Sequence, residues 1–232
     1  MAGQRPVAVV VGATGGIGRA VVDRLAGRYT LCLVGRDEAA LKTMAAEIPD
    51  SFTWTIDLAA CDGVGVVPGE LATVDLLVHT AGVFERDTIH DMPESRWRQV
   101  FAVNLFGVAE VTRSLLPALR TARGRVIVVN STVVSGSPAG RAAYAASKQA
   151  LRVFAEALRR EEFDHGVRVT SIYPGRVATG MQRTVRRAEG GPFEPDRYLA
   201  PESVASAVFS VLAAPPDAHL TEFVLEPVRY TG

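Results

Sequence analysis

Two side chains suited to proton transfer, Tyr144 and Lys148, lie four residues apart in the second half of the chain. On a helix this spacing puts both side chains on one face, one turn from each other. A cation beside a phenol favours the phenolate and lowers a pKa that is normally about 10. Such a tyrosine can give or take a proton near neutral pH, as carbonyl reduction and alcohol oxidation require. The alternative is an ordinary surface pair on an amphipathic helix.

Lysine is rare in this chain, which makes Lys148 more informative. Of the 25 basic residues only Lys42 and Lys148 are lysines, and the remainder are arginines. A lysine ammonium is compact and changes its pKa readily on burial, whereas a guanidinium does not. A lysine kept at this position therefore favours a chemical role.

A glycine-rich segment near the N-terminus lies between a strand-like and a helix-like pattern. Residues 6–11 are mostly β-branched, which is typical of a strand buried on both faces, and a helical pattern covers 19–27. Glycines between two such elements let the backbone approach a pyrophosphate, and the helix N-terminus supplies N–H groups. The alternative is a tight turn without a ligand. The predicted dinucleotide-binding residues of this turn are Gly12, Thr14, Gly15, Gly16, Ile17 and Gly18.

The end of the second expected strand, 29–34, indicates which dinucleotide binds. Gly35 stands about where an NAD site usually carries an acidic residue for the ribose 2′-hydroxyl, and Arg36 follows it. A guanidinium suits a 2′-phosphate in geometry and in charge. We therefore predict NADP(H) as the cofactor, with NAD as the alternative. Arg36 could instead be a solvated residue at the start of the expected helix 37–48.

The third expected strand, 52–56, ends in Asp57 and Leu58. A carboxylate at this strand end can accept a hydrogen bond from the adenine amino group. An Asp that caps the next segment is the alternative.

The rest of the chain also alternates strand-like and helix-like segments. The crossover 61–73 is rich in glycine and makes a poor helix. Segment 177–199 has no strong period and is expected to be a mobile excursion of loop and helix that covers the substrate. Alternating units of this kind predict an α/β fold with a doubly wound parallel sheet. The remaining expected strands are 74–78, 124–129, 167–172 and 222–225, and the remaining expected helices are 92–102, 104–120, 144–164 and 201–212.

Length and composition narrow the class of protein. A chain of 232 residues is expected to form a single domain over 1–232, and 48% hydrophobic with 22% charged residues is a soluble globular composition. Zero formal net charge gives no long-range attraction to nucleic acid or to a membrane surface. Cys32 and Cys61 fit neither a disulfide framework nor a metal site and are expected to be buried thiols. No stretch approaches the roughly 20 apolar residues of a membrane span, so a cytoplasmic location is expected.

The order and spacing of these motifs resemble the short-chain dehydrogenase/reductase family over nearly the whole length. The most specific feature is a joint spacing, with Ser131 thirteen residues before Tyr144 and Lys148 four residues after it. The resemblance implies a Rossmann-like sheet of about seven strands in the order 3-2-1-4-5-6-7, with helices on both faces. The motifs that carry the resemblance are the glycine turn, Asp57, His79-Thr80-Ala81-Gly82, Asn104, Ser131, Tyr144, Lys148 and Pro174-Gly175.

By this resemblance the chain is an NADP(H)-dependent oxidoreductase that interconverts a ketone or aldehyde and the corresponding alcohol. Tyr144 would be the general acid or base, and Ser131 would hydrogen-bond the substrate carbonyl. Lys148 would bind the nicotinamide ribose, and Asn104 would anchor a water that leads protons to Lys148. The cofactor would further contact Asp57, Leu58, Ala81, Gly82, Pro174 and Gly175.

Two positions depart from the family pattern. Val11 replaces the usual Thr before the first glycine, and His79-Thr80 replaces an Asn-Asn pair. We expect His79 to be packed in the interior, with a role as a substitute donor for the missing Asn as the alternative. Neither departure touches the residues that transfer protons.

The substrate pocket is expected to be mostly apolar, lined by Val133, Val134, Ser135, Tyr173 and the cover. Three arginines of the cover at near-helical spacing would form a solvated face or, as the sharper alternative, a clamp for an anionic substrate. These are Arg183, Arg186 and Arg187.

Three further expectations concern metals, assembly and the competing class of protein. The four histidines form no ligand spacing, so no catalytic metal is expected. Helices 104–120 and 144–164 carry apolar stripes on their outer faces, although some of these residues must instead pack on the sheet. By the resemblance, family members commonly pair through these two helices, which predicts a homodimer or homotetramer. The competing interpretation is a binding protein that senses a dinucleotide without chemistry, and a third is an epimerase or dehydratase on the same scaffold. The stripes are Leu105, Val108 and Leu115, and Leu151, Phe154 and Leu158.

Overall fold

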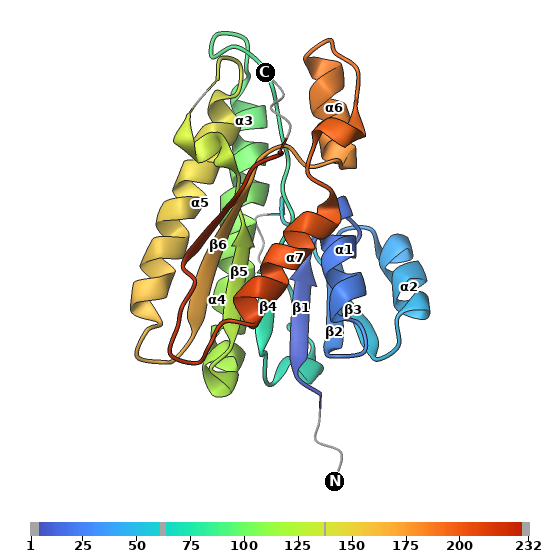
Figure 1. Ribbon diagram of the computed structural model, residues 1–232, viewed down its shortest axis with the longest axis vertical. Coiled ribbons are helices and arrows are strands. Elements are labelled where there is room, and N and C mark those ends of the chain that lie inside the picture. The colour runs from blue at the N-terminus through green and yellow to red at the C-terminus, as the bar shows by residue number, and fades with distance from the viewer. Residues whose placement is uncertain (1–4, 61–63, 137, 229–232) are drawn as a thin grey trace.

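The fold is built on a seven-stranded parallel sheet in the order β3-β2-β1-β4-β5-β6-β7, which confirms the expected topology (Figure 1). The computed structural model describes residues 5–60, 64–136 and 138–228. Strands form where the sequence carries short apolar runs, since a parallel sheet is covered on both faces. The strands are β1 Val7–Val11, β2 Thr30–Gly35, β3 Ser51–Thr55, β4 Leu76–His79, β5 Arg125–Val129, β6 Arg168–Pro174 and β7 Glu222–Leu225.

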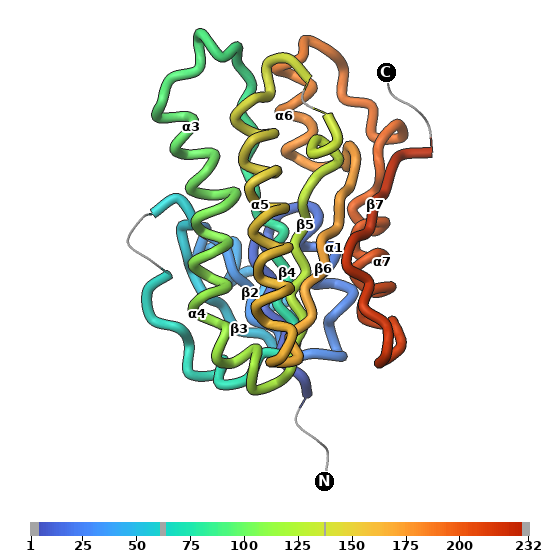
Figure 2. The backbone as a smooth tube through the Cα atoms, turned by 90° about the vertical axis from the view of Figure 1, so that its left-hand side faces the viewer, coloured from blue at the N-terminus to red at the C-terminus, as the bar shows by residue number. Residues whose placement is uncertain are grey.

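Helices cover both faces of this sheet. Helices α1, α2 and α7 lie on one face, and α4 and α5 lie side by side on the other (Figures 1 and 2). The helices are α1 Gly16–Leu25, α2 Glu38–Glu47, α3 Glu94–Phe101, α4 Gly107–Ala122, α5 Ala142–Glu161, α6 Gly180–Ala188 and α7 Pro201–Leu212. Short 3-10 turns are Gly69–Leu71, Thr132–Ser135 and Pro195–Arg197.

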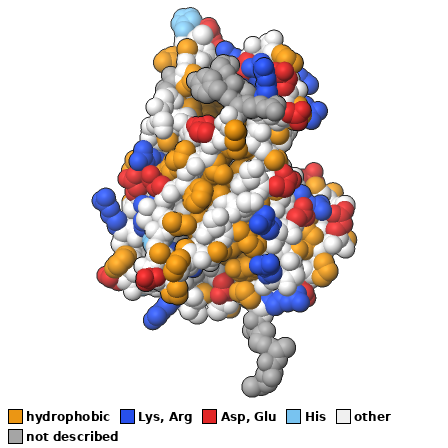
Figure 3. Space-filling model, in the orientation of Figure 1, with side chains coloured by type: hydrophobic (Ala, Val, Ile, Leu, Met, Phe, Trp, Pro, Cys, Tyr) orange, Lys and Arg blue, Asp and Glu red, His pale blue; other side chains and the backbone are white. Residues whose placement is uncertain are grey.

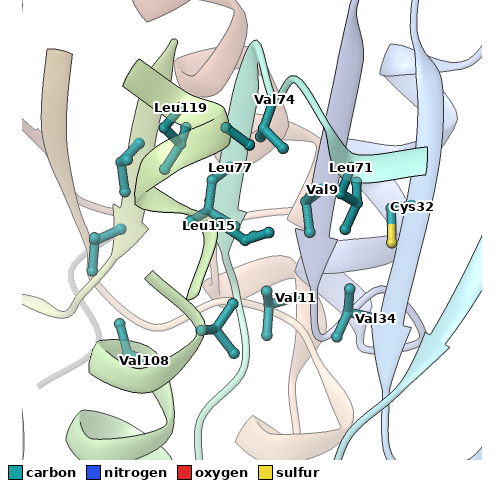
Figure 4. Close-up of a cluster of buried hydrophobic side chains, with 14 of the residues drawn as sticks. Val9, Val11, Cys32, Val34, Leu71, Val74, Leu77, Val108, Leu115 and Leu119 are labelled. Atoms are coloured by element: carbon teal, nitrogen blue, oxygen red, sulfur yellow. The ribbon is translucent and has the colours of Figure 1, made fainter. Parts of the chain in front are cut away.

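Two hydrophobic cores result, one on each face of the sheet. Alternate residues of β1 enter different cores: Val9 and Val11 pack toward α4, whereas Ala8 and Val10 pack toward α1 and α7. Figure 4 shows the first core, in which Cys32 is buried as expected. The expectation for Cys61 lies outside the described residues. Because both faces of the strands are buried, the ends of the strands, which carry the site residues, are held in place.

The two helices expected at 92–102 and 104–120 form one continuous helix. A π-helical segment, Ala102–Phe106, joins α3 to α4, so the backbone hydrogen bonds change register without a break. Such segments are rare and often occur at functional sites, and this one contains Asn104. By length and composition alone, a stretch of the combined helix Glu94–Ala122 could span a membrane, but much of that stretch is buried against the sheet.

Most residues of the two apolar stripes pack on the sheet, as was expected for some of them, and do not form an outer face. Four of the six side chains are buried in the core against the sheet, and the other two are partly buried beside it. The buried ones are Val108, Leu115, Leu151 and Leu158, and the partly buried ones are Leu105 and Phe154.

The cover is more regular than the sequence indicated. Its ends meet in an isolated parallel bridge between Val177 and Leu199, which matches the expected bounds 177–199. Between them, helix α6 projects above the sheet (Figure 1). The Thr179 hydroxyl caps this helix by accepting from the Gln182 N–H at 3.3 Å. The sequence predicted an excursion of loop and helix without locating the helix, and the structure places it at Gly180–Ala188.

Candidate functional site

A cavity of about 780 Å³ opens at the carboxyl ends of β4, β5 and β6. In an open parallel sheet this end, near the point where the strand order reverses, is where ligands bind. Below the lobe that carries α6, the outline of the molecule is indented (Figure 3). Three of the four expected catalytic residues line the cavity together with one residue of the glycine turn: Ser131, Tyr144, Lys148 and Ile17.

Helix α5 positions Tyr144 in its first turn and Lys148 one turn later. Lys148 Nζ lies 5.9 Å from the centre of the Tyr144 ring. Lys148 is 4% exposed, and its Nζ donates to Val129 O at the end of β5 at 3.2 Å. The Ser131 hydroxyl, at the start of the turn after β5, hydrogen-bonds the Tyr144 side chain. One short helix turn and one strand end thus bring the three groups together.

Burial, rather than the lysine charge, is the main influence on these groups. It lowers the pKa of the Lys148 ammonium to about 8 and raises the pKa of the Tyr144 phenol above its usual value. The hydrogen bond from Ser131 and the charge of Arg141 lower the Tyr144 pKa and oppose that rise in part. The expectation that Lys148 sets a low phenol pKa is therefore not supported, because desolvation of a buried phenol outweighs the attraction of nearby charges.

Asn104 locks the loop after β4 to helix α5. Its Oδ1 accepts from the Val83 N–H at 2.8 Å, and its Nδ2 donates to Val83 O and to Ser147 Oγ, each at 3.0 Å. A Cβ on Gly82 would lie 3.3 Å from Asn104 Oδ1 and 3.8 Å from Lys148 Nζ. The Asn104 side chain is thus engaged by the protein, and its expected role in holding a water stays a prediction.

The glycine turn fits a pyrophosphate. Gly12 has φ +85°, and a Cβ there would lie 2.8 Å from Ala81 N, so a side chain would separate the turn from the loop after β4. A Cβ on Gly18 would overlap Gly12 O. Within the described residues, helix α1 has no side-chain cap and no acidic residue in its first turn. Its first N–H groups, beside Gly15 and Gly16, are therefore open to an anion.

The residues expected around the adenosine lie outside the reaction cavity. Arg36 is exposed at the end of β2 and pairs with no other described residue. A Cβ on Gly35 would make only ordinary contact with Leu41, at 3.6 Å, so crowding does not exclude a side chain there. Asp57 Oδ1 accepts from the Ala59 N–H at 2.9 Å. Asp57 and Leu58 border a second hollow of about 380 Å³ beside α4.

Pro174 and Gly175 end β6 at the rim of the reaction cavity, together with Ala81 and Gly82. A Cβ on Gly175 would lie 2.5 Å from Glu226 Oε2 and 3.0 Å from Pro227 Cδ, so a side chain here would require these two neighbours to move. The four expected contacts at the strand ends thus lie around one opening.

His79 is packed in the interior at 2% exposure. Its Nε2 lies 3.0 Å from Thr112 Oγ1, whose own hydrogen goes to Val108 O at 2.7 Å. His79 therefore donates through Nε2–H, and its buried Nδ1 has no partner among the described residues. Burial lowers the pKa of His79 to about 3. The side chain serves as an interior donor to α4.

The cavity wall differs in part from the expected one. Val133 lines it, but Val134 and Ser135 do not, and Tyr173 is 3% exposed with its hydroxyl donating to Glu222 Oε1 at 3.0 Å. Of the cover, Thr179, Met181, Gln182 and Val185 line the cavity. The arginines Arg183, Arg186 and Arg187 do not.

Two arginines that the sequence did not single out line the cavity, Arg141 and Arg176. Arg141 immediately precedes the helix of Tyr144, and Arg176 follows the Pro174-Gly175 motif. Their position in the sequence, next to two motifs of the site, was the one signal that could have indicated them. Among the described residues no three His, Cys, Asp or Glu side chains gather as metal ligands would.

Comparisons with known proteins agree with this architecture. The short chain dehydrogenase family model matches residues 6–190. Dehydrogenase/reductase SDR family member 7B of Xenopus laevis is 33% identical over 227 residues, which cover 88% of this chain and 70% of that protein. A solved structure of a proposed NAD(P)-dependent gluconate 5-dehydrogenase from Beutenbergia cavernae with bound NADP is 32% identical, with a TM-score of 0.84 over 96% of both chains. The closed form of a serine dehydrogenase with NADP+ is 26% identical, with a TM-score of 0.86 over 97% of both chains. With its parallel sheet, its glycine turn and these relatives, the chain belongs to the short-chain dehydrogenase/reductase family of NAD(P)-binding oxidoreductases.

Proposed function

We propose that this chain is an NADP(H)-dependent oxidoreductase that interconverts a ketone or aldehyde and the corresponding alcohol, with Tyr144 as general acid and base. The observation that carries the proposal is the meeting of Ser131, Tyr144 and Lys148 in one cavity beside the glycine turn. A phenol, a hydroxyl and an ammonium are the groups that such a reaction needs at the carbonyl oxygen.

The residues present fit the cofactor. The first N–H groups of α1 would bind the pyrophosphate, Arg36 a 2′-phosphate, and Lys148 the nicotinamide ribose. When bound, the reduced nicotinamide supplies the hydride. The preference for NADP(H) is supported by the absence of a carboxylate at Gly35 although the space permits one, and by the exposed Arg36.

The chain's own residues handle the proton. Tyr144 would donate its hydroxyl proton to the carbonyl oxygen during reduction and accept a proton during oxidation. Ser131 would donate a hydrogen bond to the same oxygen and hold it near the phenol. Because burial raises the pKa of Tyr144, the phenol stays protonated at neutral pH and is ready to act as an acid. Lys148, with a pKa of about 8, is a proton carrier close to neutrality.

The test is consumption of NADPH against a panel of ketones and aldehydes, with Tyr144→Phe as the blank. We expect at least one carbonyl compound to be reduced by the wild-type chain, with the rate of Tyr144→Phe about a thousandfold lower, given the value of a positioned proton donor. Equal rates for the two proteins, or tight NADPH binding without turnover across the panel, would contradict the proposal and favour a dinucleotide-sensing protein.

A further inference from the structure

One wall of the reaction cavity consists of hydrogen-bond donors that the proposed proton transfer does not use. Arg141 and Arg176 line this wall together with Gln182. Gln182 is 7% exposed, and its amide Nε2 has no hydrogen-bond partner among the described residues. A buried amide donor left unpaired is costly, which is a reason to expect that a ligand atom approaches this wall.

The same wall carries an excess of positive charge. Three guanidiniums, those of Arg141, Arg176 and Arg186, share the single carboxylate of Glu189. Within the described part of the chain these arginines form no ion pair with another acid. Glu226 also lines the cavity, beside Gly175, and the sum of these charges remains positive. An anionic group entering the cavity would thus meet net attraction.

Arg141 is the member of this cluster that can change partners most easily. Arg176 donates to both Glu189 oxygens, at 2.9 and 3.0 Å, and Arg186 donates to Oε2 at 2.5 Å. Arg141 gives Glu189 one hydrogen bond through Nη2, and its other N–H groups have no partner among the described residues. Glu189 would therefore keep three hydrogen bonds if Arg141 turned to a ligand.

Arg141 also lies within a short substrate's reach of the reacting group. It precedes Tyr144 by three residues, and its charge is felt at the phenol, where it lowers the pKa. Its guanidinium carbon lies 6.0 Å from the centre of the Phe84 ring, which packs edge-on at 5.2 Å against the Tyr144 ring. Phe84, which also lines the cavity, thus lies beside both groups.

We propose that Arg141, supported by Arg176 and Gln182, binds a carboxylate of the substrate, so that the preferred substrates are short oxo acids and the corresponding hydroxy acids. The planar guanidinium matches a carboxylate in geometry and in charge. This inference rests on the proposed function, because it assigns the far end of a substrate whose carbonyl is held by Ser131 and Tyr144. It differs from the alternative of a clamp formed by Arg183, Arg186 and Arg187, none of which lines the cavity.

The test compares acids with their own ethyl esters, which differ in charge but share the reacting carbonyl. The probes are 2-oxobutanoate, 3-oxobutanoate and 4-oxopentanoate, each with its ester, assayed by NADPH oxidation. For at least one pair we expect kcat/KM to favour the acid tenfold or more, and Arg141→Gln to remove most of this preference through the KM of the acid. The ratio isolates substrate charge, because a changed Tyr144 pKa affects acid and ester alike.

Arg187→Gln is the matched control, since Arg187 is exposed on α6 and does not line the cavity. We expect this variant to keep the preference for the acid. If Arg187→Gln lost as much of the preference for the acid as Arg141→Gln does, the cause would be a general effect of charge, and the assignment would be overturned. Wild-type rates that do not distinguish acid from ester would overturn it as well.

A binding measurement separates this inference from the proposed function. Calorimetric titration of Tyr144→Phe with each oxo acid, with and without NADPH, should show binding that the Arg141→Gln change weakens at least tenfold. Esters reduced as well as acids would uphold the proposed function and reject the carboxylate site. Acids that bind in an Arg141-dependent way without turnover would uphold the site and reject the proposed function. No binding of any acid would overturn the site.

Discussion

Lys148 Nζ lies 5.9 Å from the centre of the Tyr144 ring, and on α5 the lysine is buried while the tyrosine is partly buried. Burial acts on the two pKa values in opposite directions, lowering that of the ammonium and raising that of the phenol. Each change favours the uncharged form of its group. The influences that lower the Tyr144 pKa come from Ser131 and Arg141, so these neighbours tune the phenol.

Ser131→Ala should therefore affect both the rate and its pH dependence. Loss of a positioned hydroxyl at the carbonyl oxygen should lower kcat about a hundredfold. Loss of its hydrogen bond to Tyr144 should raise the phenol pKa, so that the pH midpoint of alcohol oxidation moves upward. Ser135→Ala is the matched control, because Ser135 follows in the same turn but does not line the cavity. Equal effects of the two substitutions would contradict the assigned role of Ser131.

Arg36→Ala should reduce the preference for NADPH over NADH. A guanidinium bound to a 2′-phosphate forms charge-assisted hydrogen bonds, so its loss should raise the KM for NADPH roughly 10- to 100-fold. The KM for NADH, which lacks that phosphate, should change little. Lys42→Ala serves as the control, since Lys42 is an exposed cation of α2 that pairs with Glu38 at 2.6 Å. A wild-type chain with equal affinity for both cofactors would contradict the prediction.

The sheet and the reacting residues were predictable from the sequence because local patterns determine them. A buried strand such as β1 is a continuous apolar run, and the Tyr144–Lys148 spacing has meaning on any helix. The π-helical segment at Asn104 was not predictable, because a shift of backbone hydrogen bonds leaves no mark on the apolar pattern. The sequence also left open which residues of the apolar stripes pack on the sheet, because an apolar residue suits a core and an interface alike, and the structure buries Leu115 and Leu151.

The bounds of helix α6 could not be predicted from the sequence, because contacts distant in sequence stabilise it. Only Gln182 and Val185 are buried on this helix, too few to produce a visible period. Glu189, directly after it, pairs with Arg141 and Arg176 of the main body. The polar wall of the cavity depends on the same long-range pairs, so the sequence indicated an apolar pocket.

The residues that remain exposed on the long helices suggest an assembly. Phe106 is 60% exposed on the π-helical segment, and Val153 is 64% exposed on α5. Exposed large apolar side chains on neighbouring helices favour a protein interface, and we predict a homodimer or homotetramer. Light scattering should show the mass of a dimer or tetramer for the wild-type chain and a lower mass for Phe106→Glu. Ile89→Glu, at another exposed apolar residue, should leave the mass unchanged. A monomeric wild-type chain would end the prediction.

Glu189→Gln should weaken the attachment of the cover. Burial raises the pKa of the Glu189 carboxyl, but hydrogen bonds from Arg176 and Arg186 and the charge of Arg141 together outweigh it and lower the pKa to about 2 from an ordinary value of 4.5. A group with a lowered folded pKa stabilises the fold above its unfolded pKa and loses that contribution as pH falls. Wild type and variant should differ by about 3 kcal/mol in urea unfolding at pH 7 and by about 1.4 kcal/mol less at pH 3.5. Glu194→Gln, in an exposed pair with Arg197, should show no such convergence.

His79 should make the stability of the fold depend on pH above the range in which carboxyl groups titrate. Its buried ring has a folded pKa of about 3, against 6.5 in the unfolded chain. Below pH 6.5 the unfolded chain therefore binds a proton that the folded chain refuses, and the free energy of unfolding falls as pH falls. Between pH 7.5 and 5.5 the loss from this residue should be about 1.4 kcal/mol.

His79→Leu should flatten this dependence even though it also lowers stability at every pH by removing the hydrogen bond to Thr112. The readout is the difference in urea unfolding between pH 7.5 and 5.5, which is independent of that constant loss. His90→Leu, which removes an exposed imidazole outside the core, should keep the wild-type difference. If His79→Leu also kept the wild-type difference between pH 7.5 and 5.5, the interior imidazole would have to accept a proton in the folded chain. A partner for its Nδ1 would then have to exist where the described residues offer none.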